Sequence, residues 1–325
     1  MKDVNLAVKI GRLSLNNPVM AASGTFGYGE EFNDFIDLKK LGAIVSKTIT
    51  LNPRQGNPMP RTCETPAGML NSIGLENPGL EGFLKHKLPY LKKIGVPIIV
   101  SIASQVNPGE FVVLAKRLDR IREIAAIELN ISCPNVRLAG KRVNGLTGFT
   151  RSPAHPLTYK LISQDTKATY NLVKAVRKVT RKTLITKLSP NVSNITEIAL
   201  AAEAAGSDAV SLINTLTGMS IDVERRKPKI AAGAGGLSGP AIRPIAVRMV
   251  WEAYQKIKIP IIGMGGIMDT SSALEFFLAG ASAVAVGTAN FITPSITVEI
   301  IEGLKQYLIK NKIKNLSYLT GSIKI

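Results

Sequence analysis

Short apolar runs rich in Val and Ile recur along the chain, and longer amphipathic stretches separate them. Continuous apolar runs of this length are typical of strands that are buried on both faces of a parallel sheet. Eight of them can be counted: NPVMAAS, GAIVSKTIT, VPIIVSIAS, AIELNIS, TLITKLSP, AVSLINT, IPIIGMGG and AVAVGTA. The pattern therefore predicts a parallel sheet of eight strands.

The stretches around these runs have the length and start signals of helices, such as Asn107-Pro108 and Asp269. Eight strand–helix units predict an α/β fold, a closed (β/α)8 TIM barrel. An open doubly wound sheet is the alternative, and it is disfavoured because no GxGxxG follows the first run. The predicted helices span roughly 30–41, 78–94, 108–124, 164–181, 194–206, 241–257, 270–280 and 294–311.

The residues outside this alternation predict two further features, a short N-terminal hairpin and a set of long loops. The opening VKIGRLSLNNP predicts an N-terminal hairpin that plugs the floor of the barrel. Three connections that follow strands, at about 50–77, 135–163 and 215–240, are too long for simple turns. Long loops at the carboxyl ends of barrel strands usually carry binding or catalysis. The 325 residues are expected to form one domain, 1–325, with its site at that end.

The net charge of +18 is concentrated in one part of the chain. Between Arg137 and Lys182 there are eleven Lys and Arg residues against a single acid, Asp165. Either a bias toward Lys on a solvated face or an anionic partner explains this, and the bias is favoured. Segment 137–163 carries five of these basic residues and is expected to form a basic loop.

Several protein classes are disfavoured by what the sequence lacks. The first residues show no apolar core of a signal peptide, and no run reaches the roughly 20 apolar residues of a membrane span. Two cysteines, Cys63 and Cys133, favour a reducing cytoplasm, and a bridge between them is disfavoured. No CxxC occurs and His86 and His155 have no ligand spacing, so no metal site is expected.

Glycine clusters follow the last strands: GGLSGP at 235–240, GMGG at 263–266 and VGTA at 286–289. Glycine allows backbone N–H groups to approach a phosphate, and barrels often bind phosphate after strands seven and eight. A tight turn is the simpler explanation for one glycine pair. Clusters at three places instead predict a phosphorylated ligand held by Gly239, Gly265, Gly266, Gly287 and Thr288.

The fourth run ends in ELNISCPN, which places a thiol, Cys133, at the mouth of the barrel. An inert buried cysteine is the default interpretation. The neighbours Ser132 and Pro134 favour a nucleophile or a proton-abstracting base instead. Other polar residues end strands or lie in the long loops, and they predict a planar, pyrimidine-like ligand with an acidic substituent: Lys47, Asn71, Asn130, Asn135, Lys187, Asn214 and Thr215.

With these motifs the chain resembles the class 1 dihydroorotate dehydrogenases, and most of all the catalytic subunit of the NAD-linked type. The resemblance runs through AASGTFGYG, SKTIT, NSIGLENPG, ELNISCPNV, TKLSPNV, LINTLTG, GGLSGPAI, PIIGMGGI and GASAVAVGTANF. It implies an FMN-containing cytoplasmic barrel that oxidises dihydroorotate to orotate in pyrimidine (UMP) biosynthesis.

The resemblance also implies a role for each matching residue. Cys133, assisted by Ser132, would take the C5 proton while hydride leaves C6 for the flavin. The substrate would contact Lys47, Asn71, Ser72, Ile73, Gly74, Leu75, Asn130, Asn135, Asn214 and Thr215. FMN would contact Ser23, Lys47, Thr48, Ser101, Asn130, Lys187, Ile213, Gly239, Gly265, Gly266, Gly287 and Thr288.

The chain departs from the family at two places. Segment 137–163 is longer than in the family, and Ser101 stands where many relatives have asparagine. The resemblance further implies an electron-transfer subunit with FAD and a 2Fe–2S cluster, in a homodimer or heterotetramer, with no nucleic acid and no membrane as partners. The alternatives are a fumarate-linked class 1 enzyme, an RNA-modifying flavoenzyme like the dihydrouridine synthases, or a non-catalytic phosphate-binding barrel.

Overall fold

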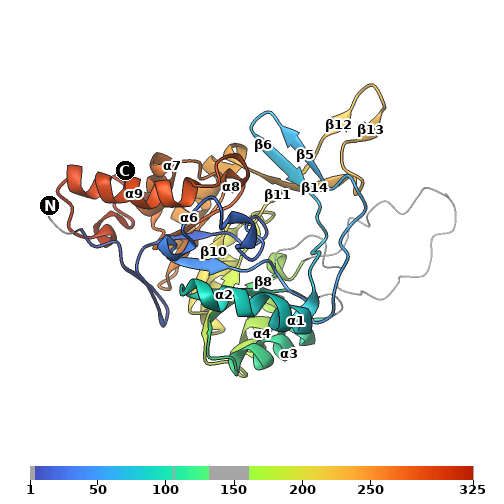
Figure 1. The fold of residues 1–325 in the computed structure, drawn as a ribbon, viewed down its shortest axis with the longest axis horizontal. Coiled ribbons are helices and arrows are strands. Elements are labelled where there is room, and N and C mark those ends of the chain that lie inside the picture. Colours follow the sequence, from blue (N-terminus) through green and yellow to red (C-terminus); the bar gives the residue numbers. More distant parts are fainter. Residues whose placement is uncertain (1–3, 105–106, 132–160, 325) are drawn as a thin grey trace.

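The computed structural model describes residues 4–104, 107–131 and 161–324. Eight parallel strands close into a barrel in the order β10-β15-β16-β3-β4-β7-β8-β9, and helices surround it (Figure 1). Each predicted run overlaps one barrel strand, so the (β/α)8 prediction is confirmed. The strands are β3 (Val19–Ala21), β4 (Ala43–Val45), β7 (Ile98–Ile102), β8 (Ile124–Asn130), β9 (Thr183–Lys187), β10 (Ala209–Leu212), β15 (Ile261–Gly263) and β16 (Ala283–Val286).

The barrel strands read as continuous apolar runs because both of their faces are buried. Alternate residues such as Ile99, Ala126 and Ile185 point into the barrel, where they form one apolar cluster. Their neighbours, for example Ile98 and Ile127, join the larger core between the strands and the helices. The interior is therefore packed with side chains and is not an open pore.

Most predicted helices are confirmed, each within a few residues of its predicted bounds. Asp165, Asn194 and Asp269 cap three of them by accepting a hydrogen bond from a first-turn N–H. The helices are α1 (Gly79–Gly82), α2 (Leu88–Ile94), α3 (Gly109–Asp119), α4 (Thr166–Arg177), α5 (Ile195–Ala204), α6 (Arg243–Tyr254), α7 (Thr270–Ala279), α8 (Ala289–Ile292) and α9 (Ile296–Lys310). A π-helical turn, η3 (Phe83–Lys87), joins α1 to α2, and three 3₁₀ turns are η4 (Ile162–Gln164), η5 (Pro240–Ile242) and η6 (Leu316–Leu319).

The helix predicted at 30–41 is wrong. This segment contains two 3₁₀ turns, η1 (Glu30–Phe32) and η2 (Leu38–Lys40). The Asp37 side chain accepts a hydrogen bond from Lys39 N at 3.0 Å, which favours a new turn over a continuing helix. Phe32 stacks on Phe26 with 4.0 Å between ring centroids and so anchors the first turn to the core.

The predicted N-terminal hairpin is confirmed and closes the amino end of the barrel. It consists of β1 (Val8–Ile10) and β2 (Leu13–Leu15), which are antiparallel. Ile10, Leu13 and Leu15 are buried in the same cluster as the inward-facing barrel residues. The floor of the barrel is thus an apolar plug.

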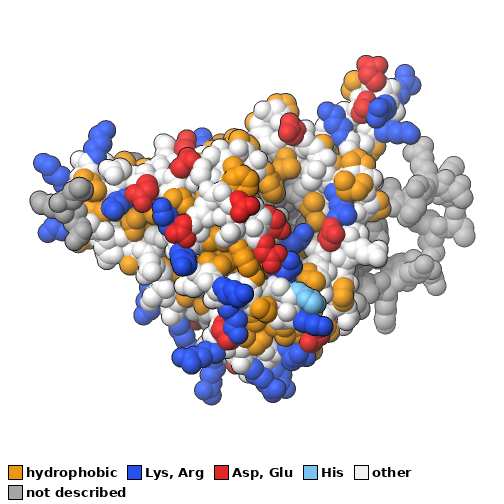
Figure 2. Space-filling model, in the orientation of Figure 1, with side chains coloured by type: hydrophobic (Ala, Val, Ile, Leu, Met, Phe, Trp, Pro, Cys, Tyr) orange, Lys and Arg blue, Asp and Glu red, His pale blue; other side chains and the backbone are white. Residues whose placement is uncertain are grey.

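Two of the long connections fold together above the carboxyl ends of the strands. They form one antiparallel sheet in the order β11-β14-β6-β5. Its strands are β5 (Thr62–Thr65), β6 (Gly68–Asn71), β11 (Leu216–Met219) and β14 (Ala234–Ser238). A small hairpin of β12 (Ile221–Asp222) and β13 (Lys227–Pro228) projects from it (Figure 1), and its tip carries exposed charged residues (Figure 2). The sequence predicted long loops here but not this sheet.

Most of the third connection, 135–163, lies outside the described residues, so the expanded basic loop stays a prediction. Within the described part of the chain, no helix combines the length and the apolar character needed to cross a membrane.

Candidate functional site

A cavity opens at the carboxyl ends of the barrel strands, beneath the four-stranded sheet. Residues at or just after the carboxyl ends of seven of the eight strands line it, and β6, β14 and the segment after β6 contribute to its wall. The space free of atoms is about 1190 Å³, including the open mouth. The cavity is therefore a partly enclosed site that is open to solvent at the mouth of the barrel.

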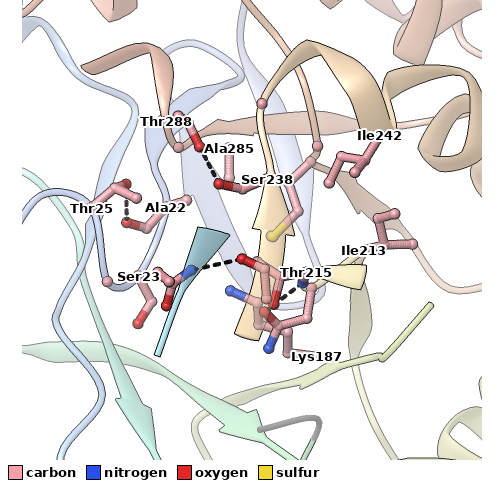
Figure 3. Close-up of a pocket in the computed structure, with 18 of the residues that line it drawn as sticks. Ala22, Ser23, Thr25, Lys187, Ile213, Thr215, Ser238, Ile242, Ala285 and Thr288 are labelled. Atoms are coloured by element: carbon pink, nitrogen blue, oxygen red, sulfur yellow. Dashed lines mark hydrogen bonds between the residues drawn. The ribbon is translucent and has the colours of Figure 1, made fainter. Parts of the chain in front are cut away.

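The two ends of the cavity have different chemistry. Lys187 and Thr215 lie toward one end, whereas Ser238 and Thr288 lie toward the other (Figure 3). At the second end Thr288 Oγ1 donates a hydrogen bond to Ser238 Oγ at 2.7 Å. The cavity therefore fits an elongated ligand whose two ends differ.

Glycines shape the end near Thr288. Gly266 has φ +74, and a Cβ there would come within 2.8 Å of Gly239 O, so only glycine fits without strain. A Cβ on Gly287 would meet nothing closer than 3.9 Å, and one on Gly24 would meet nothing within 4 Å. The cavity wall is therefore open at Gly24 and makes only ordinary contacts at Gly287. Together with the Ser238 and Thr288 hydroxyls, these two glycines form a cradle that suits a phosphate.

A hydrogen-bond network lies below the cavity and is centred on Thr48. Its hydroxyl is bonded to the Ser23 hydroxyl at 3.0 Å and to the Ser101 hydroxyl at 2.9 Å, and it accepts a bond from Asn130 Nδ2 at 3.1 Å. Asn214 Nδ2 donates to Asn130 Oδ1 at 3.4 Å. One donor and two acceptor positions are all that a hydroxyl offers, so Thr48 is saturated. The network fixes the positions of both asparagine side chains.

Two lysines supply positive charge to the cavity. Lys187, at the end of β9, is only 5% exposed, and Lys47, after β4, is half-buried. Among the described residues neither forms an ion pair with an acid. The pKa of Glu76 is lowered, first by the hydrogen bond from Arg61 and also by the charge of Lys47. Cations that have so few acidic contacts in a half-closed cavity favour an anionic ligand.

The loop after β6 forms one wall of the cavity. Asn71 donates a hydrogen bond through Nδ2 to Gly236 O at 3.3 Å, and Ile73, Gly74 and Leu75 follow it along the wall. Ser72 does not line the cavity: it is 2% exposed, and its hydroxyl accepts a bond from Asn57 Nδ2 at 2.7 Å. This arrangement gives Ser72 a role in holding the loop.

Most predicted site residues come together in this one cavity. The cavity lining includes Ser23, Lys47, Thr48, Asn71, Ile73, Gly74, Leu75, Asn130, Lys187, Ile213, Asn214, Thr215, Gly239, Gly265, Gly266, Gly287 and Thr288. Ser101 is fully buried behind Thr48 and is not part of the lining. Ser132, Cys133 and Asn135 lie outside the described residues, and Cys63 is a free thiol in β5.

Some lining residues were not predicted from the sequence. Ser238, Gly236 and Met264 belong to the quoted glycine clusters, so the signal was present and their side chains were overlooked. The remaining ones are apolar or small, and all but Met268 lie within quoted motifs without having been singled out. These residues are Ala22, Gly24, Thr25, Ile242, Ile267, Met268, Ala285 and Ala289.

Comparison with known proteins gives consistent results over the whole chain. The family model described as dihydroorotate dehydrogenase matches residues 5–148 and 150–308. A protein of Trichlorobacter lovleyi named dihydroorotate dehydrogenase B (NAD(+)), catalytic subunit, is 50% identical over 318 residues, 98% of each chain. Proteins with the same name are 49% identical in Thermoanaerobacter pseudethanolicus (99% of this chain and 100% of that one) and 48% in Bacteroides fragilis (99% of each chain).

Proposed function

Since the chain belongs to the dihydroorotate dehydrogenase family, we propose that it is the catalytic subunit of an NAD-linked enzyme that oxidises dihydroorotate to orotate in pyrimidine biosynthesis. The observation that carries this is the identity of about 50% over essentially the whole chain with catalytic subunits of that name. The cavity supports it, because Lys47, Asn71, Asn130 and Asn214 line one pocket. Carboxamides match the amide and imide edges of a pyrimidine ring, and a lysine matches its carboxylate.

The cofactor we propose is FMN, and the residues present fit it. The cradle of Gly24, Gly287, Ser238 and Thr288 suits its phosphate. Lys187 suits the flavin ring, because a nearby cation stabilises the negative charge that reduction adds. When bound, FMN would supply the hydride acceptor of the reaction. Purified protein should therefore be yellow with a flavin absorbance spectrum, and a colourless protein that takes up no FMN contradicts this.

The chain's own residues perform the other half of the oxidation in this proposal. Cys133 removes the C5 proton of dihydroorotate as its thiolate, with Ser132 beside it. Asn130, fixed by Thr48, and Asn214 hold the ring in place. The substrate carboxylate is oriented by Lys47. Holding the reacting carbons in one orientation converts an encounter into an intramolecular step.

The test is Cys133→Ser, with Cys63→Ser as the matched control. Turnover at neutral pH should fall by about 10²–10⁴-fold for Cys133→Ser, since a serine hydroxyl is a far weaker base, while orotate binding is largely retained. Cys63→Ser should leave turnover unchanged. Full activity in Cys133→Ser would remove Cys133 from the mechanism.

The electron acceptor and the assembly are also part of the proposal. The relatives are named as catalytic subunits of an NAD(+) enzyme, which supports a separate electron-transfer subunit with FAD and a 2Fe–2S cluster. We propose a cytoplasmic complex built on a homodimer of this chain, as a heterotetramer. Turnover should be compared with fumarate, with NAD alone, and with NAD plus the partner subunit. Turnover only in the last assay supports the NAD-linked type, and efficient fumarate reduction by the isolated chain overturns it.

A further inference from the structure

Only two charged side chains occur in the eight barrel strands, and they lie on neighbouring strands. All eight strands are among the described residues, and apart from Glu128 in β8 and Lys187 in β9 their side chains are apolar or neutral. Lys187 belongs to the cavity wall, whereas Glu128 does not line the cavity. The proposed mechanism gives Glu128 no role. A buried acid in the most apolar part of a protein therefore needs an explanation.

Glu128 points into the barrel and reaches across β9. It lies between the inward-facing Ala126 and Asn130, and it is 2% exposed. Ser211 Oγ, on β10, donates a hydrogen bond to Glu128 Oε2 at 3.0 Å. In the strand register Glu128 pairs with β9 at Ile185, while Ser211 pairs with β9 at Lys187. The carboxyl group therefore crosses the inner face of the strand on which Lys187 stands.

Neither charge is neutralised by a direct contact. No ion pair joins Glu128 to Lys187, and among the described residues Glu128 Oε1 has no hydrogen-bond partner. An isolated charge in the interior is costly, whereas two opposite charges on adjacent strands offset much of that cost even without contact. No other barrel-strand residue can offset the charge of either one.

We propose that Glu128 is the buried counter-charge of Lys187 and a positioning residue of the site: its carboxylate partly offsets the positive charge of Lys187 at the cavity wall and so weakens the pull of that charge on the bound flavin. The inference rests on the proposed function for its effect on FMN. Lys187 alone would favour the reduced, more negative flavin, and the carboxylate beneath it opposes that effect. The pair would thus set the reduction potential of the flavin without Glu128 touching the ligand.

The test compares variants by the reduction potential of bound FMN, which reflects the ratio of its dissociation constants in the oxidised and reduced states. Glu128→Gln should favour reduced FMN by roughly tenfold in this ratio, the order expected of one unit charge in a partly screened interior. Lys187→Met should shift the ratio in the opposite direction. The double variant Glu128→Gln/Lys187→Met should lie closer to the parent protein than Lys187→Met does.

Two control variants separate charge from packing. Glu110→Gln removes the acid that accepts a bond from Ser104 Oγ at 3.0 Å and is 8% exposed, but it lies on α3, outside the barrel. Ser211→Ala removes the hydrogen bond to Glu128 and keeps the charge. Both should change the ratio by less than about twofold. An unchanged potential in Glu128→Gln, or a shift toward oxidised FMN, overturns the proposal.

The same cycle can be read without the flavin. In the apoprotein, the unfolding free energies of Glu128→Gln, Lys187→Met and the double variant should be non-additive, with the double variant losing less than the two single variants together. If the losses of unfolding free energy in the two single variants add up to the loss in the double variant, Glu128 is not the counter-charge of Lys187. A parent protein that binds no FMN but shows this non-additivity would instead remove the proposed function and leave the charge pair standing.

Discussion

The floor and the mouth of the barrel are built from the same eight strands and have opposite character. At the amino ends, the hairpin residues Ile10, Leu13 and Leu15 pack on inward-facing apolar residues. At the carboxyl ends, the inward-facing positions include polar residues such as Asn130 and Lys187, which line the cavity. One end of each strand thus contributes to stability and the other to binding.

The two ends also differ in what they need from outside the chain. The floor satisfies itself, because an apolar plug requires only contact with other apolar groups. At the mouth, Lys47 and Lys187 line the cavity, and among the described residues neither lysine forms an ion pair. A ligand can therefore supply the negative charge that they lack. Substitutions should therefore separate stability from ligand binding according to the end at which they are made.

The largest expected effect is at the floor. Leu15 is 2% exposed, and Leu15→Ala should lower the free energy of unfolding by about 2–5 kcal/mol because it leaves a cavity in the plug. FMN affinity of the folded protein should change by less than about threefold, since Leu15 lies at the far end of the strands. Chemical denaturation and flavin titration measure the two quantities. Leu200→Ala, on the exposed side of α5, is the control and should cost less than about 0.5 kcal/mol. A large loss of FMN affinity in Leu15→Ala would mean that the two ends are not independent.

At the mouth, a substitution at Gly287 is expected to weaken FMN binding while leaving the stability of the protein unchanged. A Cβ at this position makes ordinary contacts at 3.9 Å, so Gly287→Ala should be tolerated. Gly287→Val extends further into the cavity and should weaken FMN binding by about 5–150-fold, corresponding to an overpacking cost of about 1–3 kcal/mol. Its unfolding free energy without ligand should stay within about 0.5 kcal/mol of the parent protein. Equal FMN affinity for the glycine, alanine and valine proteins would place the phosphate elsewhere.

The strand ends explain why so much of the mouth could be predicted from the sequence. Runs such as TLITKLSP show both the strand and the polar residue that closes it, so Lys187 could be placed at the carboxyl end from local pattern alone. The same holds for the glycine clusters after β15 and β16. The hairpin in VKIGRLSLNNP and the helix start at Asp269 were equally local signals, and the structure confirms both.

The sequence missed two kinds of feature: pairing between segments distant in sequence and the local turns of one short segment. The strands β6 and β14 pair through Asn71 and Gly236, and nothing in either stretch indicates its partner. The Ser72 hydroxyl accepts a hydrogen bond from Asn57 and Ser72 does not line the cavity, so its predicted contact with substrate stays a prediction. The helix predicted at 30–41 failed for a local reason, because the Asp37 side chain starts a separate turn by accepting a hydrogen bond from Lys39 N. Local pattern indicates which residues reach the mouth, whereas long-range pairing decides which of them face the cavity.

The smallest expected effect concerns Asp269, which supports the mouth without lining it. It caps α7 just after Gly266, and the backbone N–H of Ser272 is the main cause that lowers its pKa below the usual 3.8. A lowered folded pKa adds stability above the unfolded pKa, and this stability is lost as pH falls through the folded value. Because Asp269 is exposed, screening keeps the gain small, about 0.3–1 kcal/mol.

Asp269→Asn keeps an oxygen that can accept the Ser272 N–H bond but removes the charge. The parent protein should therefore be more stable than Asp269→Asn at pH 6, and the difference should disappear in denaturation curves as the pH falls below the lowered pKa of Asp269. Glu224→Gln, at the exposed tip of the β12–β13 hairpin, removes a charge away from any helix end and should show no such convergence. FMN affinity at neutral pH should be unchanged, because Asp269 does not line the cavity and, like the residues of the floor, contributes only to stability. If Asp269→Asn lost FMN affinity while its stability stayed intact, Asp269 would take part in ligand binding although it does not line the cavity.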